Sequence, residues 1–318
     1  MKIFVAGASG VLGVQLVPML VAAGHQVVAM TRTASKQDGL RALGARPVVA
    51  DALDPDAVAK AVGEAEPEVI VHQLTALSGP VGMRDARHPE RSPAVIMTNR
   101  LRTEATDHLL AAGRAVGARR FVAQSVAAFR FTGGPVQTEA ESLDPDPPAA
   151  LRPGLAGILH LEQAVTSMEW GEGLVLRYGS FYGPGTAISL APDALMAAPI
   201  RKRRFPIVGD GGGVWSHVHI EDAAAATAAA VEHGRPGIYN VVDDEPARVR
   251  EWLPELASAL GAKPPRRVPR WLARLAAGEA AAVMMTEARG ASNAKAKREL
   301  DWQLRYPSWR LGFAKGLG

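Results

Sequence analysis

Short apolar runs alternate with helical stripes through the first half of the chain. Runs of three to five residues without a charged side chain are typical of strands buried on both faces, and they fall at 3–6, 26–30, 48–50, 69–71, 121–123 and 174–176. Apolar residues spaced by three and four predict helices between them, at 11–23, 55–63, 94–116 and 161–168. This alternation predicts an α/β fold, a Rossmann-type doubly wound parallel sheet.

The pattern changes after Arg177. Glycine clusters at 183–185 and 209–213 interrupt the chain. The elements expected here are helices at 191–198, 221–231 and 250–260, strands at 205–208 and 238–242, and short helices around Trp271 and Lys295. We therefore expect residues 1–177 to form the sheet domain, joined by the helix and strand near 220–242. Residues 178–318 then mostly form a smaller C-terminal substrate lobe over the carboxyl edge of the sheet, where open α/β folds bind ligands.

Composition narrows the class of protein. The 318 residues include no cysteine, which excludes a disulfide-stapled scaffold and is compatible with a reducing cytoplasm. The apolar start at 1–6 is too short for a signal peptide, and the alanine-rich stretch 223–231 is too short to span a bilayer. We expect a cytoplasmic protein with no membrane partner.

The formal charge is +4, and the basic residues gather late in the chain, at Arg201–Arg204, Arg266, Arg267, Arg270 and Arg274. A nucleic-acid partner is disfavoured because no aromatic residues interleave this run in a binding pattern. The simpler interpretation is a solvated surface, or one that attracts an anionic cofactor or substrate.

A glycine-rich turn follows the first strand, and a helix follows the turn. Gly7, Gly10 and Gly13 form the pattern G-x-x-G-x-x-G, with Ser9, Val11 and Leu12 between them. Such a turn brings backbone close to a pyrophosphate, and the N-terminus of the following helix offers free N–H groups to it. We expect these six residues to bind a dinucleotide.

The end of the second strand predicts which dinucleotide. NAD sites place an acid there, about 20 residues on, for the ribose 2′-hydroxyl. Here Arg32 lies 19 residues after Gly13, Lys36 follows, and no Asp or Glu occurs before Gln37. A guanidinium pairs well with a phosphate, so the sequence predicts NADPH/NADP+.

Further motifs accompany this turn, and together they resemble the extended short-chain dehydrogenase/reductase superfamily, in its epimerase/dehydratase-like branch. The segments that match the superfamily pattern are 7–13, 49–51, 71–76, Asn99 with Thr103, 121–125, 176–179, 182–185, 217–222, 239–240 and 292–302. The resemblance implies that Asp51 and Ala52 lie near the adenine and that Leu74, Thr75 and Ala76 lie near the ribose and phosphates. It also implies that Tyr178 and Phe181 lie near the nicotinamide, with further cofactor contacts from Asn99 and Ala123.

The catalytic residues of that superfamily are missing. Its chemistry uses Tyr-x-x-x-Lys with a Ser or Thr, the tyrosine trading a proton with the substrate oxygen. None of the four tyrosines has a lysine four residues later. Alignment on Glu162 places Gly154, Ile158 and Val126 at the tyrosine, lysine and Ser/Thr positions. In this departure the chain resembles the atypical NADPH-dependent ketoreductases of aromatic polyketide tailoring.

The resemblance implies reduction of a ketone on a polycyclic aromatic, angucyclinone-type polyketide to an alcohol in antibiotic biosynthesis. We expect the substrate's own phenol to disperse the oxyanion charge, with weak proton-donor candidates in Ser125, Thr75 and Tyr182. Expected substrate contacts are Ser125, Tyr182 and His217.

Two different functions remain open. A non-catalytic NADP(H) sensor would also lack the triad, and a nucleotide-sugar epimerase or dehydratase would share the fold but needs the tyrosine as a base. His217 and His219 would face one way on a strand, yet no third ligand is placed for a metal. Asp222 is expected to cap the helix that follows it.

Overall fold

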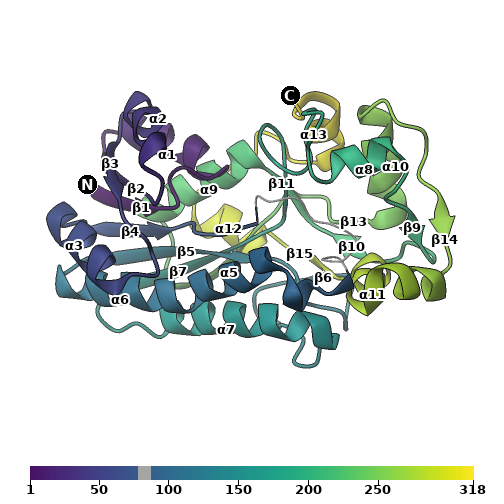
Figure 1. The fold of residues 1–318 in the computed structure, drawn as a ribbon, viewed down its shortest axis with the longest axis horizontal. Coiled ribbons are helices and arrows are strands. Elements are labelled where there is room, and N and C mark those ends of the chain that lie inside the picture. Colours follow the sequence, from purple (N-terminus) through teal and green to yellow (C-terminus); the bar gives the residue numbers. More distant parts are fainter. Residues whose placement is uncertain (78–86) are drawn as a thin grey trace.

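A seven-stranded sheet organises the larger part of the molecule (Figure 1). The computed structural model describes residues 1–77 and 87–318. The strands are β1 (Lys2–Ala6), β2 (Gln26–Thr31), β3 (Arg46–Val49), β4 (Val69–His72), β5 (Arg120–Val126), β7 (Glu172–Tyr178) and β12 (Gly237–Val241). They follow one another across the sheet as β12-β7-β5-β4-β1-β2-β3, and every neighbouring pair is parallel. The predicted Rossmann-type fold class is confirmed.

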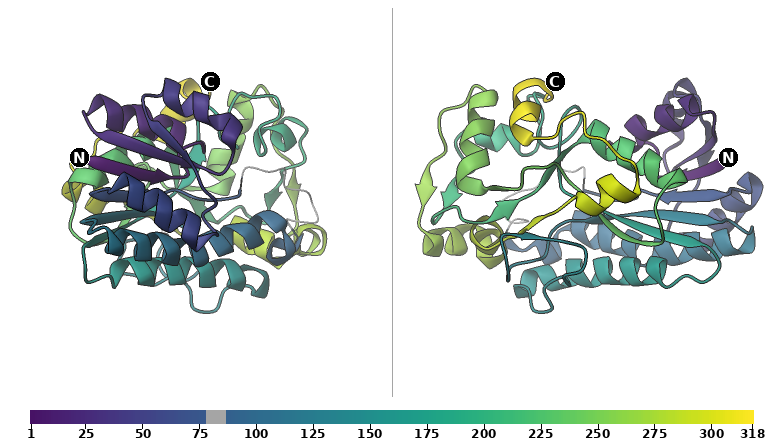
Figure 2. Two further views of the ribbon diagram at one scale, coloured as in Figure 1. Left: turned by 60° about the vertical axis from the view of Figure 1, so that its left-hand side comes forward. Right: turned by 180° about the vertical axis from the view of Figure 1, so that it is seen from behind.

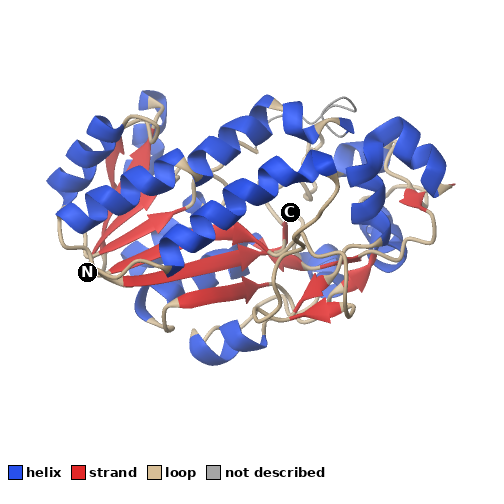
Figure 3. Ribbon diagram, turned by 90° about the horizontal axis from the view of Figure 1, so that it is seen from below, coloured by secondary structure: helices blue, strands red, loops and turns tan. Residues whose placement is uncertain are grey.

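Helices cover both faces of this sheet (Figures 2 and 3). On one face α1 (Gly13–Ala22) packs against α9 (Ile220–Glu232), and α2 (Gln37–Ala42) lies beside β3. The other face carries α3 (Pro55–Ala65), α5 (Pro93–Arg102), α6 (Glu104–Ala115) and α7 (Arg152–Thr166). Alternate residues of β1 enter the two cores, Ile3 and Val5 into one and Phe4 into the other. Burial on both faces explains why the strands are continuous apolar runs.

The smaller lobe lies beyond the carboxyl edge of the sheet, at the right of Figure 1. Its elements are β8 (Ser180–Tyr182), α8 (Ala197–Arg201), β9 (Ile207–Val208), β10 (Val214–Trp215), β11 (His217–His219), β13 (Ala247–Arg248), α10 (Val249–Ala259), β14 (Arg267–Val268), α11 (Arg270–Thr286) and α13 (Trp309–Lys315). Its core is aromatic, with Trp252, Trp309 and Tyr182 fully buried and Phe313 among them. The segments β6 (Val136–Gln137), β15 (Gly290–Ala291) and α12 (Ala294–Glu299) connect it to the sheet. The domain boundary at residue 177 stays a prediction, although α9 and β12 do join the sheet.

Two expected helices differ in the structure. The single helix expected at 94–116 is two, α5 and α6, broken at Thr103, where φ is −99° and ψ −81°. The Thr103 hydroxyl donates to the Asn99 carbonyl at 3.0 Å, a back-bond that bends helices. The helix expected at 191–198 was wrong in its bounds: α8 covers only Ala197–Arg201, because Pro192 disfavours helix at the residue before it and has no N–H of its own.

Two more helices are longer than the pattern predicted. The helix expected at 161–168 begins at Arg152, with Pro153 in its first turn, a position where proline's missing N–H costs nothing. The apolar pattern did not predict this start, because Gly154 and Gly157 interrupt the spacing of apolar residues in the first turns. Instead of a short helix around Trp271, α11 runs for 17 residues with a kink at Gly278, where φ is 87° and ψ 168°.

The sequence prediction for Asp222 was wrong. The N-cap of α9 is His219, whose ring accepts the Glu221 amide at 3.2 Å. Asp222 lies in the first turn and accepts the amides of Arg305 and Tyr306 at 2.8 and 2.9 Å. Its carboxylate therefore fixes the C-terminal segment to α9 rather than capping the helix.

Candidate functional site

The glycine-rich turn is closed so tightly that side chains do not fit. Gly7 has a φ of +92°, and a Cβ on it would lie 2.7 Å from the backbone of Gln73 at the end of β4. A Cβ on Gly13 would lie 2.4 Å from the Ala8 carbonyl oxygen. The Gly10 amide donates to the Gly7 carbonyl at 3.0 Å, so the turn runs straight into α1. The Val14 amide already donates to the Gly10 carbonyl at 3.0 Å, whereas the amides of Leu12 and Gly13 donate to no backbone carbonyl of the described residues. Free N–H groups at the start of a helix fit a pyrophosphate.

The end of β2 lies beside this turn. The hydroxyls of Ser9 and Thr31 are 3.2 Å apart, and Thr31 Oγ1 also accepts the Thr33 amide at 3.3 Å. This pairing holds the strand end against the loop. Arg32 and Lys36 follow it with exposed side chains, at the end of the strand where the sequence predicts them.

The other expected cofactor residues lie along the carboxyl edge of β3, β4 and β5. Asp51 is exposed and accepts the Leu53 amide at 3.0 Å, while Ala52 is buried. The loop of Leu74, Thr75 and Ala76 is held by two amide donations, Leu74 to His72 Nδ1 at 3.3 Å and Ala76 to Thr98 Oγ1 at 3.0 Å.

Tyr178 and Phe181 contact each other, with ring centroids 5.3 Å apart. The Tyr178 hydroxyl lies 2.6 Å from Thr227 Oγ1 of α9 and accepts from Gln73 Nε2 at 3.1 Å. Burial raises the pKa of Tyr178. This phenol is therefore hydrogen-bonded on the α9 side of the sheet, and burial keeps it protonated at neutral pH. Ala123 is fully buried in β5. Asn99 Oδ1 is buried at α5, and a Cβ on Gly157 of α7 would lie 3.1 Å from it.

The three triad positions form an apolar cluster. Ile158 is buried with Leu143 and Leu155, and Val126 and Phe129 pack against them. Gly154 offers only backbone; a Cβ there would lie 3.6 Å from Cζ of Phe129. Within the described residues, no acid, hydroxyl or amine stands at any of the three positions. The folded site therefore has no substitute for the triad tyrosine at this position, because the Phe129 ring fills the space beside Gly154.

Phe129 is a site residue that the sequence did not reveal. It is half-buried and has a φ of +62°, a strained conformation for a residue with a Cβ. Its carbonyl accepts the Asp144 amide at 2.8 Å, which holds the strained turn. No local sequence pattern predicts that a phenylalanine adopts the left-handed backbone conformation at this position.

Ser125 is bound within a buried ionic group. Its hydroxyl donates to Glu162 Oε1 at 2.7 Å, and the same carboxylate accepts two N–H groups of Arg177 at 2.7 and 2.5 Å. The Glu162 and Arg177 side chains are each 5% exposed. This geometry does not favour Ser125 as a free donor to substrate, because its proton already points to a carboxylate. Thr75, in contrast, is exposed.

The structure argues against two expected substrate contacts. Tyr182 and His217 are fully buried in the aromatic core of the lobe. A Cβ on Gly312 would lie 2.1 Å from the Tyr182 hydroxyl, and the His217 ring lies 5.0 Å from Trp252. Neither side chain has surface open to a small molecule, since both rings pack edge-on against Phe313 inside the lobe. In the described part of the chain, no three His, Asp or Glu side chains gather as metal ligands.

Several polar atoms in this aromatic core lack a partner among the described residues. They are Tyr182 Oη, His217 Nδ1 and Nε2, Asp243 Oδ2, Trp252 Nε1 and Trp309 Nε1. Burial lowers the pKa of His217 to about 3 and raises that of Asp243 to about 8. The sequence did not single out Asp243, which directly follows the β12 region.

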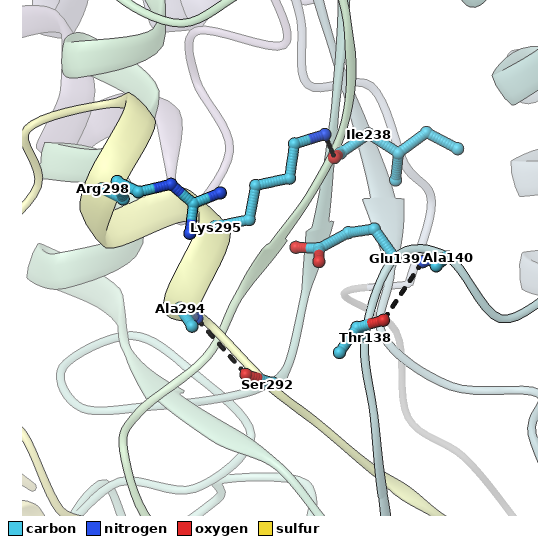
Figure 4. A pocket seen from close by; sticks show the side chains of 8 residues that line it. All are labelled: Thr138, Glu139, Ala140, Ile238, Ser292, Ala294, Lys295 and Arg298. Atoms are coloured by element: carbon cyan, nitrogen blue, oxygen red, sulfur yellow. Dashed lines mark hydrogen bonds between the residues drawn. The ribbon is translucent and has the colours of Figure 1, made fainter.

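An open groove of about 510 Å³ lies on the outer side of the edge strand β12 (Figure 4). Glu139 Oε1 accepts the Asn240 amide at 2.7 Å, and Lys295 Nζ donates to the Ile238 carbonyl at 2.8 Å. Two charged side chains thus take hydrogen-bonding positions that a further strand would use. The groove contains none of the expected site residues, so we assign it a structural role.

Comparisons with known proteins identify the family and support the fold. The model of the NAD dependent epimerase/dehydratase family matches residues 3–241. A 3-diazoavenalumate denitrifying reductase of a Streptomyces species is 45% identical over 99% of the chain and 100% of that protein. A 2-alkyl-3-oxoalkanoate reductase of Stenotrophomonas maltophilia is 31% identical over 82% of the chain and 76% of that protein. The structure of Thermus thermophilus UDP-glucose 4-epimerase in complex with NAD has a TM-score of 0.72 and 23% identity, covering 100% of this chain and 98% of the other.

Proposed function

The chain belongs to the NAD dependent epimerase/dehydratase family and is a reductase within it, and from this premise we propose that it removes the diazo group of an aromatic carboxylate reductively, as dinitrogen. The observation that carries the proposal is the apolar cluster of Val126, Ile158 and Phe129 around Gly154. A reaction catalysed there must not depend on a protein acid. The full-length likeness to a denitrifying reductase supports this choice.

The proposed reaction needs no acid because its leaving group is neutral. A hydride forms the new C–H bond with its own electron pair, the C–N bond of the arenediazonium breaks, and that pair leaves with N₂. No oxyanion forms, and no proton is consumed. Reduction of a ketone differs, since its alkoxide must be stabilised and protonated.

We propose NADPH as the reductant. When bound, the dinucleotide supplies the hydride. The chain's contribution is to hold it: the backbone of Gly7–Gly13 at the pyrophosphate, and Arg32 and Lys36 at the 2′-phosphate. Replacing Arg32 with Ala should reduce NADPH affinity by roughly tenfold, equivalent to about 1.4 kcal/mol, and leave NADH affinity unchanged. Equal affinity of the natural protein for both cofactors in a binding titration would refute the preference.

The aromatic part of the proposal rests on Phe129. Its half-buried ring lies beside Gly154, so the face that usually carries a phenol is here an apolar wall. A flat aromatic substrate packs well on such a wall, whereas a hydroxyl-rich sugar would leave polar groups unpaired against it.

The direct test is stoichiometry. Purified protein is mixed with NADPH and an ortho-hydroxy arenediazonium carboxylate labelled with ¹⁵N, and the reduced nicotinamide absorbance and ¹⁵N₂ release are followed together. We expect one N₂ and one deaminated arene per NADPH oxidised, and no reaction with a Gly13→Val variant. A hydrazine product, or NADPH oxidation without N₂, would overturn the proposal.

Ketone reduction, expected from the sequence, is the second candidate. The likeness to a 3-oxoalkanoate reductase favours it. It would need the substrate's own phenol, or the exposed Thr75, as the proton source, since Ser125 already donates to Glu162. A panel of polycyclic aromatic ketones under the same assay compares the two candidates, and a Thr75→Val variant should keep most ketone turnover if the substrate supplies the proton.

A cofactor sensor and a nucleotide-sugar enzyme have less support. A sensor would bind NADPH but oxidise it with no substrate in either panel. An epimerase or dehydratase needs a base at position 154, where this chain has no side chain.

A further inference from the structure

The late basic residues form one surface at the end of the molecule remote from the glycine-rich turn. Residues 201–210 and 262–275 contain nine Lys or Arg and one Asp, a net charge of +8. The whole chain is only +4, so the remainder is net negative. In Figure 1 these segments, at β9, β14 and α11, lie at the opposite end from α1 and β2. These cations therefore lie too far from the glycine-rich turn to bind the cofactor phosphates. An anionic cofactor was one of the partners that the sequence analysis considered for this charge.

The two segments are held together in space. β9 and β14 pair in parallel, and the Ile207 amide donates to the Arg266 carbonyl at 2.8 Å. Arg203 Nε donates to the Pro264 carbonyl at 3.1 Å. β14 then leads directly into α11. Five exposed cations, which we call the basic cap, share this surface: Lys202, Arg204, Lys263, Arg266 and Arg267.

The basic cap is electrostatically unbalanced. None of its five members forms an ion pair with a carboxylate of residues 1–77 or 87–318, whereas Arg270 and Arg274 on α11 pair with Glu287 and Glu279. Like charges held close together repel one another, and a partner of opposite charge relieves this repulsion. The same repulsion argues against a second copy of the chain as the partner.

Large apolar side chains accompany these charges. Trp271 is 68% exposed, Leu275 63% and Leu272 39%, all on the first part of α11. Ala273 on the same turn is buried and holds the helix to the lobe. The kink at Gly278 separates this exposed part from the buried part that follows. A helix that presents tryptophan and leucine between arginines is typical of attachment to a lipid surface.

We propose that the basic cap and the exposed part of α11 bind the surface of an anionic phospholipid bilayer. The lipid phosphates would neutralise the basic cap, and Trp271 and Leu275 would enter the headgroup region. Attachment is peripheral, because no helix within the described ranges is long and apolar enough to cross a membrane. The sequence expectation of no membrane partner considered spanning segments only. Nucleic acid fits less well, since phosphates offer nothing to two exposed leucines.

The test uses the full chain and vesicles. At low salt the protein should co-sediment with phosphatidylglycerol/phosphatidylcholine vesicles. It should stay in the supernatant with vesicles of pure phosphatidylcholine. An Arg266→Glu/Arg267→Glu variant should bind at least about tenfold more weakly, because each cation near an anionic bilayer is worth roughly fivefold. The matched control Arg46→Glu/Arg114→Glu changes two exposed arginines elsewhere and should bind as the natural protein does.

A second readout reports insertion. The tryptophan emission should shift to the blue on vesicle binding, and a Trp271→Phe variant should lose that shift while keeping its melting temperature. Three results would overturn the proposal: no binding to anionic vesicles at low salt, equal weakening in both double variants, or binding to DNA or heparin without binding to vesicles. NADPH binding, measured separately, should be the same in all variants.

Discussion

The carboxyl edge of the sheet and the aromatic core of the smaller lobe differ in how far their buried polar groups are hydrogen-bonded. Near the sheet edge, Ser125, Glu162, Arg177 and Tyr178 are buried and hydrogen-bonded to one another or to Thr227 and Gln73, and only Nη1 of Arg177 among these four side chains lacks a partner in the described residues. In the lobe, Tyr182, His217 and Asp243 are buried with atoms that no described residue satisfies. Satisfied polar groups rigidify a site, and unsatisfied ones cost stability. The difference indicates that the sheet edge is built for fixed positions, whereas the stability of the lobe depends on its protonation state.

The largest effect on cofactor affinity should come from the glycine turn. Gly13→Ala places a Cβ 2.4 Å from a backbone oxygen, so the loop must shift and NADPH affinity should fall by roughly a hundredfold, about 2.8 kcal/mol. Gly63→Ala in α3 has nothing within 4 Å and should stabilise the protein by about 1 kcal/mol. Calorimetric titration and thermal melts measure both. Unchanged NADPH binding in Gly13→Ala would mean that the turn does not hold the cofactor.

The buried ionic group should have a large effect on folding stability instead of on cofactor affinity. Glu162→Gln leaves Arg177 unpaired in the interior and should cost about 3–5 kcal/mol of unfolding free energy. Ser125→Ala removes one hydrogen bond, should cost about 1 kcal/mol, and should keep most turnover. Urea unfolding and steady-state rates check the pair. A thousandfold loss of turnover in Ser125→Ala, with stability retained, would instead identify Ser125 as a catalytic acid.

Asp243 should make the lobe sensitive to pH. Its folded pKa of about 8 is above the ordinary 3.8, chiefly through burial, with the charges of Glu245 and Asp244 adding to the rise. The folded state therefore holds the proton more tightly. This contribution is complete below pH 4 and is lost as pH rises to 8, at up to roughly 1.4 kcal/mol for each pKa unit.

The Asp243→Asn variant cannot ionise, so its urea midpoint should fall less than that of the natural protein between pH 5 and pH 8. Asp193→Asn, on an exposed residue, is the matched control and should change nothing. If Asp243→Asn retained the natural pH slope, the ionisation would belong to another group.

The smallest expected effect concerns Phe129. Phe129→Ala removes the aromatic wall and should weaken binding of an aromatic carboxylate up to about tenfold, the value of a stacked pair, while NADPH affinity stays the same. Gly154→Ala is a suitable control because its Cβ would make only ordinary contact at 3.6 Å. Equal weakening in both variants would point to a general disturbance of α7.

The sequence was informative where structure is local. Short sequence patterns predict the turn at 7–13, the strands of the sheet and the absence of the catalytic triad. Each of these features depends on a few consecutive residues: an apolar run, a glycine motif or a missing tyrosine. The start of α7 was missed because Gly154 and Gly157 break the apolar stripe. The role of Asp222 was misjudged, and the burial of Tyr182 and His217 was not foreseen, because these residues contact partners 83 to 131 positions away, such as Arg305 and Phe313. The strained Phe129 depends on a whole loop and leaves no local signal.

A site that transfers hydride without a protein acid must deliver the new hydrogen from the nicotinamide and not from solvent, and isotope labelling separates these two origins. The diazo substrate is reduced once with NADPH deuterated at the transferring position in H₂O, and once with ordinary NADPH in D₂O. We expect one deuterium at the former diazo carbon in the first product, none in the second, and a single-turnover rate that is flat from pH 6 to pH 9. Deuterium from solvent at that carbon, or a rate that follows the protonation of one group, would contradict it.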